Sequence, residues 1–491
     1  MSADEALTWI QEYRDLRETV ERAVLPIATS VDGRRFEYQA SLHGLDLEAG
    51  GYVAIETGEE TRLGQLLSLE MQTLTTSVPG RHGQIMVRAA QGEGALLDGG
   101  GRPFHDARVR RAAPAEVGAW RERSRSSSAT LSVGELALAP GVPFELDARG
   151  FGRHTFLCGQ SGSGKTYSLG VLVERLLAET SLRVVVIDPN SDYVHLGERR
   201  ADADPAAAAR YEERAGPIVV RSGADGDSRL GLHFRELAAA QQAALLRLDP
   251  VADRDEYAQL AAIAETATPD TLEALADGDE QAKRLVLRAT NIGVHRFGVW
   301  SREQDVSILD DVVDGDIRCL VADLGSLADP AERTLVAGAM LERLWRRRAE
   351  RQPVAIVIDE AHNVCPAKPE DALTALATED AIRIAGEGRK FGLYLIVVTQ
   401  RPQKVHENVL SQCDNLVLMR MNSVADLGHV AEVFSFVPPG LIERASTFGL
   451  GEALVAGKIA SHPALIRFGR RVAEEGGGDI DARWARGTLT T

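Results

Sequence analysis

The chain has 491 residues, of which 44% are hydrophobic and 26% are charged. This length and composition favour several packed domains and exclude a disordered chain or a small disulfide-stabilised scaffold. With 55 Lys and Arg residues against 72 Asp and Glu residues, the net charge of −17 excludes a uniformly basic coat for nucleic acid, although a locally basic channel remains compatible with it.

Cysteine usage and hydropathy bear on the compartment of the protein. The four cysteines are far apart and form no C-x-x-C pair, which indicates reduced thiols in a protein core. The N-terminus has the charged, amphipathic pattern of a helix and not that of a signal peptide, and no run reaches the roughly 18–20 apolar residues that a membrane helix needs. We therefore expect a cytoplasmic protein without a membrane segment.

The N-terminal part of the chain divides into three predicted segments. Residues 1–24 carry apolar side chains at spacings of three and four, which predicts a surface helix. From 25 to 110 the pattern changes to short alternating strands separated by glycine, which predicts a small β-barrel. Residues 111–132, rich in arginine and serine, have the composition of a linker.

Residues 133–468 have a different pattern. Continuous apolar runs, such as 184–187 and 354–358, end in polar residues and alternate with helical segments, as in a parallel sheet covered on both faces. An Ala- and Leu-rich stretch at about 237–300 lacks strand signals and predicts a helical insertion. Residues 469–491 are expected to form a C-terminal tail. The sequence thus predicts an α/β core behind a small barrel.

The strongest motif in the sequence is a phosphate-binding loop. Eight consecutive residues fit the pattern G-x-x-x-x-G-K-[ST], after an apolar strand and before a helical pattern: Gly159, Gln160, Ser161, Gly162, Ser163, Gly164, Lys165 and Thr166. The glycines let backbone N–H groups surround phosphate oxygens at a helix N-terminus. In this pattern Lys165 neutralises the β- and γ-phosphates of ATP, and the Thr166 hydroxyl ligates Mg²⁺. The strand–loop–helix context argues against an accidental glycine-rich turn.

Two adjacent carboxylates end another apolar strand. Asp359 and Glu360 follow the run 354–358, and ligands bind at the carboxyl edge of a parallel sheet. A nucleotide site needs one acid to order the metal's water shell and one to activate the attacking water. We expect Asp359 to be the Mg²⁺ partner and Glu360 the general base, although an isolated run of this kind is more often a plain strand end.

Two further strand ends offer polar groups to the same edge. Gln400 ends the strand before Arg401 and could contact the attacking water or the γ-phosphate. The alternative is a capped strand end with a surface arginine. Asp188 closes the strand after the phosphate-loop helix, where a role beside the water or the metal and ordinary turn chemistry are equally compatible with the pattern.

Three arginines are candidates for a finger that acts on the site of a neighbouring subunit. In a ring ATPase such an arginine reaches the γ-phosphate and raises the rate by orders of magnitude. Arg389 is the first candidate, Arg153 the second and Arg401 the third. Basic residues at a helix C-terminus also fit the helix dipole alone. The basic run 344–351 is compatible with phosphate contacts but is more typical of a solvated helix face.

Together these segments resemble the HerA-like ATPases of the HerA–FtsK class of hexameric DNA translocases, over about 133–467. The resemblance rests on Arg153-His154, GQSGSGKT (159–166), DPNSDY (188–193), IVIDEAH (356–362), EGRKFG (387–392), TQRP (399–402) and SQCDN (411–415). The sequence departs from the family at Gln160-Ser161, where Lys/Arg/Met-Thr is common. It also departs at 190–192, where His-Gly-Glu is usual, which leaves the role of Asp192 open.

The resemblance implies a RecA-like P-loop NTPase core, preceded by the small barrel that such ATPases share with rotary ATP synthase subunits. It implies a homohexameric ring with ATP and Mg²⁺ bound between subunits and double-stranded DNA in the central pore. In many members it also implies a NurA-type nuclease for DNA-end resection or another effector protein in antiviral systems. A ring can be acidic outside and basic inside, because a Debye length of ~8 Å at physiological salt screens the outer charges from the pore.

Three functions are compatible with these expectations. The leading hypothesis is an ATP-dependent DNA translocase or helicase motor. The second is an ATPase ring that scaffolds and regulates a nuclease or NAD-consuming effector, with DNA translocation secondary, and a partner-binding surface on 1–110 would distinguish it. The third, a membrane-coupled export motor, is disfavoured because the sequence has no transmembrane run.

Overall fold

The structure is a computed structural model that describes residues 3–24, 26–58, 60–77, 84–98, 101–125, 129–223, 228–263, 280–301 and 305–477. These residues form two compact units. The barrel unit lies within Met1–Ser127, Gly134–Glu145 and Arg420–Phe468, and the sheet unit lies within Ser128–Val133, Leu146–Met419 and Gly469–Thr491.

The barrel unit contains a closed ring of six antiparallel strands. The order is β2-β1-β7-β3-β4-β6, and β6 pairs back with β2, so the ring has no free edge. β5 lies outside the ring and pairs with β6. The bounds are β1 Ile27–Ser30, β2 Arg35–Ser41, β3 Tyr52–Thr57, β4 Glu60–Leu66, β5 Glu70–Ser77, β6 Gln84–Leu96 and β7 Phe104–Arg111.

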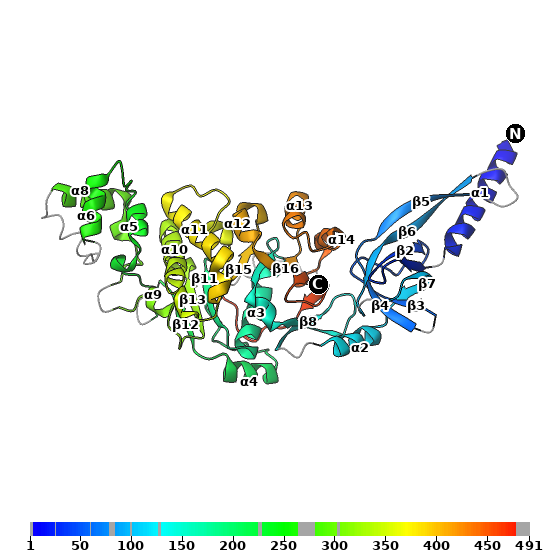
Figure 1. Cartoon of the computed structure of the whole chain (residues 1–491), viewed down its shortest axis with the longest axis horizontal. Helices are drawn as coiled ribbons and strands as arrows, with labels where there is room; N and C mark the ends of the chain where they lie inside the picture. Colours follow the sequence, from blue (N-terminus) through cyan, green and yellow to red (C-terminus); the bar gives the residue numbers. More distant parts are fainter. Residues whose placement is uncertain are drawn as a thin grey trace, which may run out of the picture. The chain divides into compact units, whose positions relative to one another are not determined.

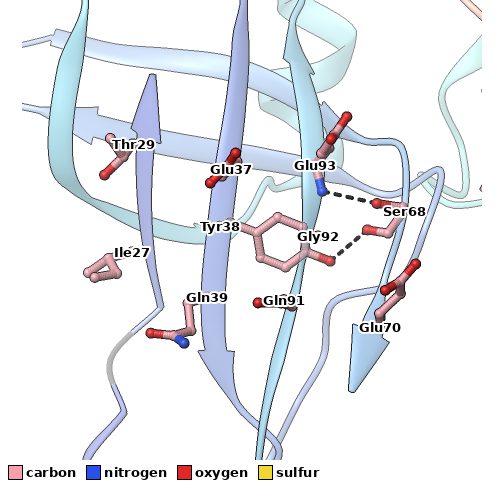
Figure 2. Close-up of a pocket in the computed structure, with 10 residues that line it drawn as sticks. All are labelled: Ile27, Thr29, Glu37, Tyr38, Gln39, Ser68, Glu70, Gln91, Gly92 and Glu93. Carbon is pink, nitrogen blue, oxygen red and sulfur yellow. Dashed lines mark hydrogen bonds between the residues drawn. The ribbon is translucent and has the colours of Figure 1, made fainter. Parts of the chain in front are cut away.

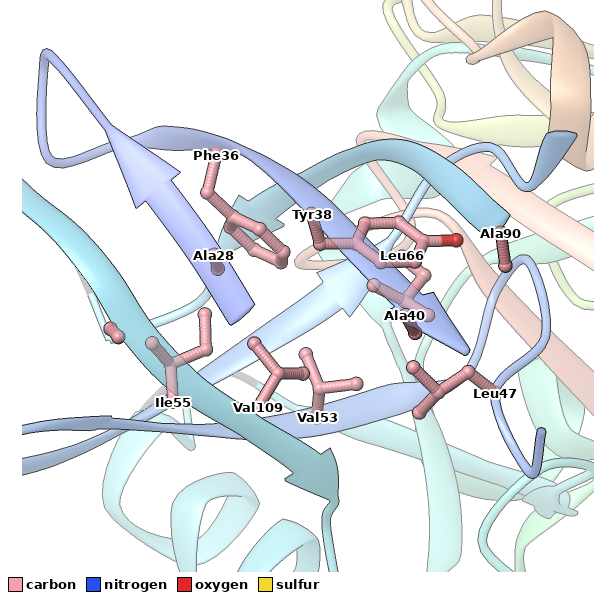
Figure 3. Packing of buried hydrophobic residues seen from close by; sticks show 11 residues of the cluster. Ala28, Phe36, Tyr38, Ala40, Leu47, Val53, Ile55, Leu66, Ala90 and Val109 are labelled. Carbon is pink, nitrogen blue, oxygen red and sulfur yellow. The ribbon is translucent and has the colours of Figure 1, made fainter. Parts of the chain in front are cut away.

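Alternating side chains fill the inside of this barrel (Figure 3). Along β2, Phe36, Tyr38 and Ala40 are buried while Glu37 is exposed, as the period of two along a strand requires. Gly94 on β6 leaves the space for the Phe36 ring, because a Cβ there would lie 2.1 Å from a ring carbon. The packing therefore specifies the register between β2 and β6.

Besides β5, four further strands and four helices outside the ring lie wholly or partly in the barrel unit. β18 pairs antiparallel with both β17 and β8. Helix α1 packs against β6, where a Glu21 carboxylate oxygen accepts a hydrogen bond from the Arg88 N–H (3.0 Å). The bounds are α1 Ala3–Ala23, α2 Pro114–Ser124, β8 Thr130–Leu136, β9 Pro143–Asp147, α13 Val424–Val433, α14 Pro439–Glu443, β17 Glu452–Gly457 and β18 Ala464–Phe468.

The segment 111–132, for which the composition predicts a linker, contains helix α2. Pro114 stands in the first turn, where a missing N–H leaves no helical hydrogen bond unmade. The Glu116 carboxylate accepts a hydrogen bond from the Ala113 N–H (2.8 Å), and the Trp120 side chain is buried. The cap and the buried Trp120 side chain thus stabilise a helix that the arginine-rich composition of the segment does not predict.

The sheet unit is built on seven parallel strands in the order β12-β13-β11-β14-β15-β10-β16. Most are buried along their whole length and rich in Val, Ile and Leu, as expected for a sheet covered on both faces. The bounds are β10 His154–Cys158, β11 Arg183–Asp188, β12 Ile218–Arg221, β13 Cys319–Asp323, β14 Val354–Ile358, β15 Leu393–Thr399 and β16 Cys413–Met419.

Helices cover both faces of this sheet (Figure 1). α3 and α4 follow strands from which the chain steps toward β12, and α10, α11 and α12 follow strands from which it steps toward β16. Because crossovers between parallel strands are right-handed, the two groups must lie on opposite faces. The bounds are α3 Lys165–Glu179, α4 Pro205–Arg214, α10 Pro330–Arg346, α11 Ala372–Glu387 and α12 Glu407–Leu410.

Between β12 and β13 the described chain is mainly helical, which confirms the predicted insertion at about 237–300. α6 packs against α8, and α5 packs against α11. Residues 264–279 of this insertion and 478–491 of the predicted tail lie outside the described residues. The bounds are α5 Ala239–Leu245, α6 Arg254–Ile263, α8 Glu280–Ile292 and α9 Ile308–Asp311.

The predicted fold class, an α/β RecA-like core preceded by a small β-barrel, is confirmed. In the portion of the chain that the structure describes, none of the helices combines the length and the apolar character required to cross a bilayer. The parallel strands β10, β11, β14 and β15 bring their carboxyl ends to one edge of the sheet. The residues that follow these strands are therefore neighbours in space, although they are far apart in the sequence.

Candidate nucleotide site

The predicted phosphate loop joins β10 to α3. Gly162 and Gly164 have φ angles of 72° and 91°, a region that other residues rarely adopt, and Gly164 is the N-cap of α3. Gly159 has no room for a side chain, because a Cβ there would lie 2.7 Å from the Cβ of Met419. The loop thus leads directly into the N-terminus of α3, where backbone N–H groups bind anions.

The side chains of the loop differ in their surroundings. Gln160 is half-buried and Ser161 is exposed. Ser163 is fully buried, and its hydroxyl has no hydrogen-bond partner within the described part of the chain. A buried hydroxyl without a partner is costly in a folded protein. Its presence beside an anion-binding loop is explained if a ligand supplies the missing hydrogen bond.

Lys165, the first residue of α3, lies between two carboxylates. Its Nζ is 3.2 Å from Oδ1 of Asp359 and 3.1 Å from Oε1 of Glu360. None of the three side chains is more than 10% exposed. The phosphate-loop lysine and the two predicted acids are therefore in direct contact, close enough to share one bound nucleotide.

The electrostatics of this cluster follow from its burial and its ion pairs. Burial alone would lower the pKa of Lys165, but the charges of Asp359 and Glu360 outweigh it and raise that pKa. Burial alone would raise the pKa of Glu360, but a hydrogen bond from His362 and the charge of Lys165 outweigh it and lower that pKa to about 2. The lysine is therefore cationic and the glutamate anionic at neutral pH.

Local contacts hold the two carboxylates in place. Asp359 accepts hydrogen bonds from the Glu360 N–H (2.8 Å) and from the hydroxyl of the buried Tyr193 (3.4 Å). Glu360 has a φ of 43°, an uncommon value for a residue with a side chain. Backbone strain of this kind persists where the surroundings impose it, and it is concentrated at functional sites. Tyr193 was not singled out from the sequence, although it ends the segment 188–193.

His362 connects the base to the neighbouring strand. Its Nδ1 lies 3.2 Å from Oε2 of Glu360 and 3.1 Å from the Thr399 hydroxyl. The same hydroxyl accepts a hydrogen bond from the Arg401 N–H (3.0 Å). Gln400 lies between these two residues, half-buried at the end of β15 and beside the start of the phosphate loop. In the sequence, His362 is visible only as the last residue of the motif IVIDEAH (356–362), which by itself gives it no role.

Asp188 and Asp192 occupy the loop after β11. Asp188 is fully buried and accepts hydrogen bonds from the N–H groups of Asn190, Asp192 and Tyr193 (3.2, 3.1 and 2.8 Å), which is turn chemistry. Asp192 lies at the site itself, with Oδ2 3.5 Å from the Thr166 hydroxyl. Burial, together with the nearby charge of Asp359, raises the pKa of Asp192 to about 6.

The first two arginine candidates lie at the opposite edge of the sheet. Arg153 directly precedes β10 and Arg389 precedes β15, and Nη1 of each lies 3.4 Å from Oδ2 of Asp414 near the start of β16. The side chains are 41%, 48% and 40% exposed, respectively. β10 is five residues long, so its amino end is roughly 16 Å from the phosphate loop. Arg401, in contrast, follows β15 at the carboxyl edge and is exposed.

The residues present fit a divalent metal. Two buried carboxylates face one ammonium group, so the cluster has an excess of negative charge, and the Thr166 hydroxyl lies next to another carboxylate. Among the described residues, no three His, Cys, Asp or Glu side chains are grouped so as to hold a metal on their own. Nucleotide sites bind Mg²⁺ through one or two carboxylates together with waters and phosphates.

A second concave feature lies on the outer face of the barrel (Figure 2). Its volume is about 490 Å³, and it is lined by side chains from β1, β2, β5 and β6. The carboxylates of Glu37, Glu70 and Glu93 are exposed there. Tyr38 donates a hydrogen bond to the Ser68 carbonyl at its floor (2.9 Å). This face is acidic and therefore suits a basic partner more than a nucleic acid.

The comparisons with known proteins find similarity to HerA helicases. The family described as "Helicase HerA, central domain" matches residues 131–290. The DNA double-strand break repair helicase HerA of Saccharolobus solfataricus is 26% identical over 70% of this chain and 69% of its own length. Its counterpart from Pyrococcus furiosus is 25% identical over 69% of each chain. The solved structure of VirB4 of Thermoanaerobacter pseudethanolicus covers 70% of this chain and 97% of its own, with 15% identity and a TM-score of 0.46.

The fold and the cluster at its carboxyl edge define a P-loop ATPase. The matched family narrows this class of ATPase further, because the match begins at the start of β8 and includes the whole phosphate loop. The chain is therefore HerA-like: it is similar to the curated HerA helicases over about 70% of its length.

Proposed function

We propose that this chain is the ATP-dependent motor of a DNA translocase or helicase. The observation that carries the proposal is the contact of Lys165 with both Asp359 and Glu360 at the carboxyl edge of the parallel sheet. The names of its relatives support DNA as the substrate, since they are described as DNA double-strand break repair helicases. Hydrolysis of ATP at this cluster would supply the energy for movement along the duplex.

The cluster suggests a role for each residue. Lys165 and the loop 159–166 bind the phosphates of ATP, for which the lysine must exchange its carboxylate partners for phosphate oxygens. That exchange removes a cation from Glu360 and raises its proton affinity, so the glutamate becomes a better general base once nucleotide is bound. Gln400 orients the attacking water. Thr166 and Asp359 would hold Mg²⁺, which when bound neutralises charge on the β- and γ-phosphates.

The arginines support an assembly of several copies. Arg153 and Arg389 are too far from the phosphate loop of their own chain to reach its nucleotide, because a strand separates the two edges. An exposed pair of arginines at one edge and a buried acidic cluster at the other are complementary surfaces for a head-to-tail interface. We infer a closed homohexameric ring in which these arginines act on the γ-phosphate of the next subunit.

Double-stranded DNA in the central pore is the partner that follows from this assembly. The net charge of −17 does not oppose it, because a ring with a basic lining is screened from its outer acids over about one Debye length, ~8 Å. A NurA-type nuclease or another effector protein is the further partner that the family resemblance implies. With DNA and a nuclease or effector protein as partners, we propose that the protein acts in the cytoplasm.

The second candidate function is a ring that scaffolds an effector, with DNA movement secondary. The acidic concave face of the barrel, with Glu37, Glu70 and Glu93, favours it, since such a face suits a basic segment of a protein partner. DNA would be repelled there.

The two functions are separated by the effect of DNA on hydrolysis. Phosphate release is measured with the full-length protein and Mg²⁺–ATP, with and without linear duplex DNA. The motor function predicts a rate that rises with duplex DNA, and a matched Glu360→Gln variant whose phosphate release is lower by ~10²- to 10⁴-fold under both conditions. An unchanged rate with DNA, together with co-purification of a stoichiometric protein partner from the native host, would support the scaffold and contradict the motor.

A further inference from the structure

The C-terminal segment 469–477 is attached to the phosphate-loop helix through a fully buried ion pair. Arg471 Nε donates to Oε1 of Glu174 on α3 (2.9 Å), and both side chains are 0% exposed. The same carboxylate accepts hydrogen bonds from the N–H groups of Val472 (2.7 Å) and Ala473 (3.2 Å). The ion pair is retained because Glu174 compensates the buried charge of Arg471, although Nη1 of Arg471 has no hydrogen-bond partner within the described part of the chain.

Helix α3 is shaped to receive this arginine. A Cβ on Gly170 would lie 2.4 Å from the guanidinium carbon of Arg471, so only glycine leaves the space for it. One turn earlier on the helix, the Tyr167 hydroxyl accepts a hydrogen bond from the Arg471 N–H (2.9 Å). Tyr167, Gly170 and Glu174 have the spacing of one helix face. They begin one residue after Thr166, within the first turn of the phosphate-loop helix.

The far end of the segment contacts the loop that follows β11. The Gly476 N–H donates to the Asp192 carbonyl (3.1 Å). A Cβ on Gly476 would lie 2.0 Å from the carbonyl oxygen of Ser191, and one on Gly477 would lie 2.4 Å from Oδ1 of Asp192. Close backbone contact of this kind requires glycine. The segment therefore joins two parts of the nucleotide site, the phosphate-loop helix and the Asp192 loop.

Asp192 lies on the side of the site where a metal would be held. Its Oδ2 is 3.5 Å from the Thr166 hydroxyl, the group expected to ligate Mg²⁺. The Asp192 carboxylate is repelled by the charge of Asp359 and attracted by that of Lys165, so it interacts electrostatically with the cluster. A loop that carries such a carboxylate needs support, because a displaced group contributes much less to a charged site.

We propose that the segment 469–477 is a positioning element of the nucleotide site: by locking onto α3 through Arg471 and onto the Asp192 loop through Gly476, it holds the Asp192 carboxylate beside Thr166 for Mg²⁺-dependent nucleotide binding. This inference rests on the proposed function of the same site. It assigns to the C-terminal end of the ATPase core a role in substrate binding, beyond a role in stability.

The cleanest test displaces Arg471 without changing any charge. Gly170→Ala places a methyl group where the guanidinium lies, while alanine improves the intrinsic helix propensity of α3. The matched control is Gly386→Ala on α11, where an added Cβ meets nothing within 4 Å. The affinity for ADP is measured by calorimetry on the full-length protein, with Mg²⁺ and with EDTA, alongside thermal unfolding.

The expected result is a loss specific to the metal. Gly170→Ala should weaken Mg²⁺–ADP binding by about tenfold, or ~1.4 kcal/mol, and change metal-free ADP binding by less than about twofold. Gly386→Ala should bind as the parent does. Asp192→Asn should show the same metal-specific loss, and the double variant with Gly170→Ala should lose no more than the larger single loss, because both act on one carboxylate.

Two results would overturn the inference. One is a Gly170→Ala variant that unfolds at a lower temperature yet keeps the parental Mg²⁺–ADP affinity, which would make the segment a purely structural strap. The other is a loss that is equal with and without Mg²⁺ or additive with Asp192→Asn. Failure of the proposed function has different signatures, since a parent that is no motor would hydrolyse ATP at a rate that duplex DNA does not raise, and a parent without a nucleotide site would bind no ADP under either condition.

Discussion

The two edges of the central parallel sheet carry opposite kinds of site. At the carboxyl edge, Lys165, Asp359 and Glu360 are at most 10% exposed and form ion pairs with each other within the chain. At the amino edge, Arg153 and Arg389 share one carboxylate, and their side chains are 41% and 48% exposed. The charged side chains of the carboxyl edge are buried and paired within the chain, whereas the arginines of the amino edge are exposed enough to contact another surface. In the proposed ring, the arginines of one chain would meet the buried cluster of the next.

The largest expected effect on nucleotide affinity and on stability comes from removing the cation at the carboxyl edge. Lys165→Met leaves two buried carboxylates facing each other without a cation. Nucleotide affinity should fall by more than about a hundredfold, which corresponds to ~2.7 kcal/mol. The free energy of unfolding should also fall, by about 3 kcal/mol, because breaking a buried ion pair leaves a charge uncompensated. Calorimetry with ADP and urea unfolding measure the two effects, and parental values for both would contradict the buried cluster.

The next effect tests whether the amino edge acts on another subunit. Arg389→Ala, alone or with Arg153→Ala, should lower the rate of ATP hydrolysis by ~10³-fold. ADP affinity should stay close to parental, because each chain keeps its own phosphate loop. The measurement is steady-state phosphate release together with calorimetry.

A mixing experiment shows whether the arginine acts in trans. Glu360→Gln subunits retain their arginines, and Arg389→Ala subunits retain their base, so each alone should be inactive. A mixed assembly forms some interfaces that contain both groups, and hydrolysis should reappear. A mixture that stays inactive, although size measurements show that the subunits assemble together, would contradict action in trans.

A smaller effect is expected from a buried histidine at the amino edge. Burial lowers the pKa of His154 from 6.5 to about 4, and its Nδ1 accepts a hydrogen bond from the Leu395 N–H (2.9 Å). The neutral ring contributes stability above pH 6.5 that is lost as the pH falls through 4, because the unfolded chain then binds the extra proton. Between about pH 7 and about pH 4.5 this amounts to roughly 2–3 kcal/mol.

The control for that prediction is His154→Asn, in which the amide oxygen can replace Nδ1 as the acceptor but does not titrate. Urea unfolding at the two pH values should show a smaller loss of stability for the variant than for the parent. An identical loss in both proteins would show that His154 does not titrate as described.

The smallest effect concerns the carboxylate that the two arginines share. Asp414→Asn removes an ion pair whose members are 40–48% exposed. Its effect on the free energy of unfolding should be below about 1 kcal/mol, as for other exposed pairs. Thermal unfolding checks this, and a loss several times larger would mean that the amino edge is a buried structural site and not an exposed one.

The carboxyl edge could be predicted from the sequence because its signals are local. The phosphate loop is contiguous, and Asp359 and Glu360 directly follow an apolar strand. Parallel-sheet topology then requires these strand ends to meet, so the contact of Lys165 with the two acids follows from the rules of the fold. The barrel was predictable for a similar reason, since alternation and glycines mark its strands.

Contacts between distant segments could not be predicted in this way. In the sequence, Glu174 is one charged residue in an amphipathic helical pattern, and Arg471 lies in a segment with the composition of a tail. Their ion pair joins residues 297 positions apart, and no local sequence pattern predicts such a contact. Helix α2 was missed because arginines dominate its composition, while a proline and one capping glutamate define its start.

In the proposed mechanism, water hydrolyses ATP at the cluster around Lys165, and Glu360 is the general base that activates this water. Phosphate release by Glu360→Gln at saturating Mg²⁺–ATP, compared with the parent at equal ADP affinity, tests it most directly. Release should fall by ~10²- to 10⁴-fold, the range that general-base catalysis supplies, while ADP affinity changes by less than about twofold. Release at the parental rate would contradict it.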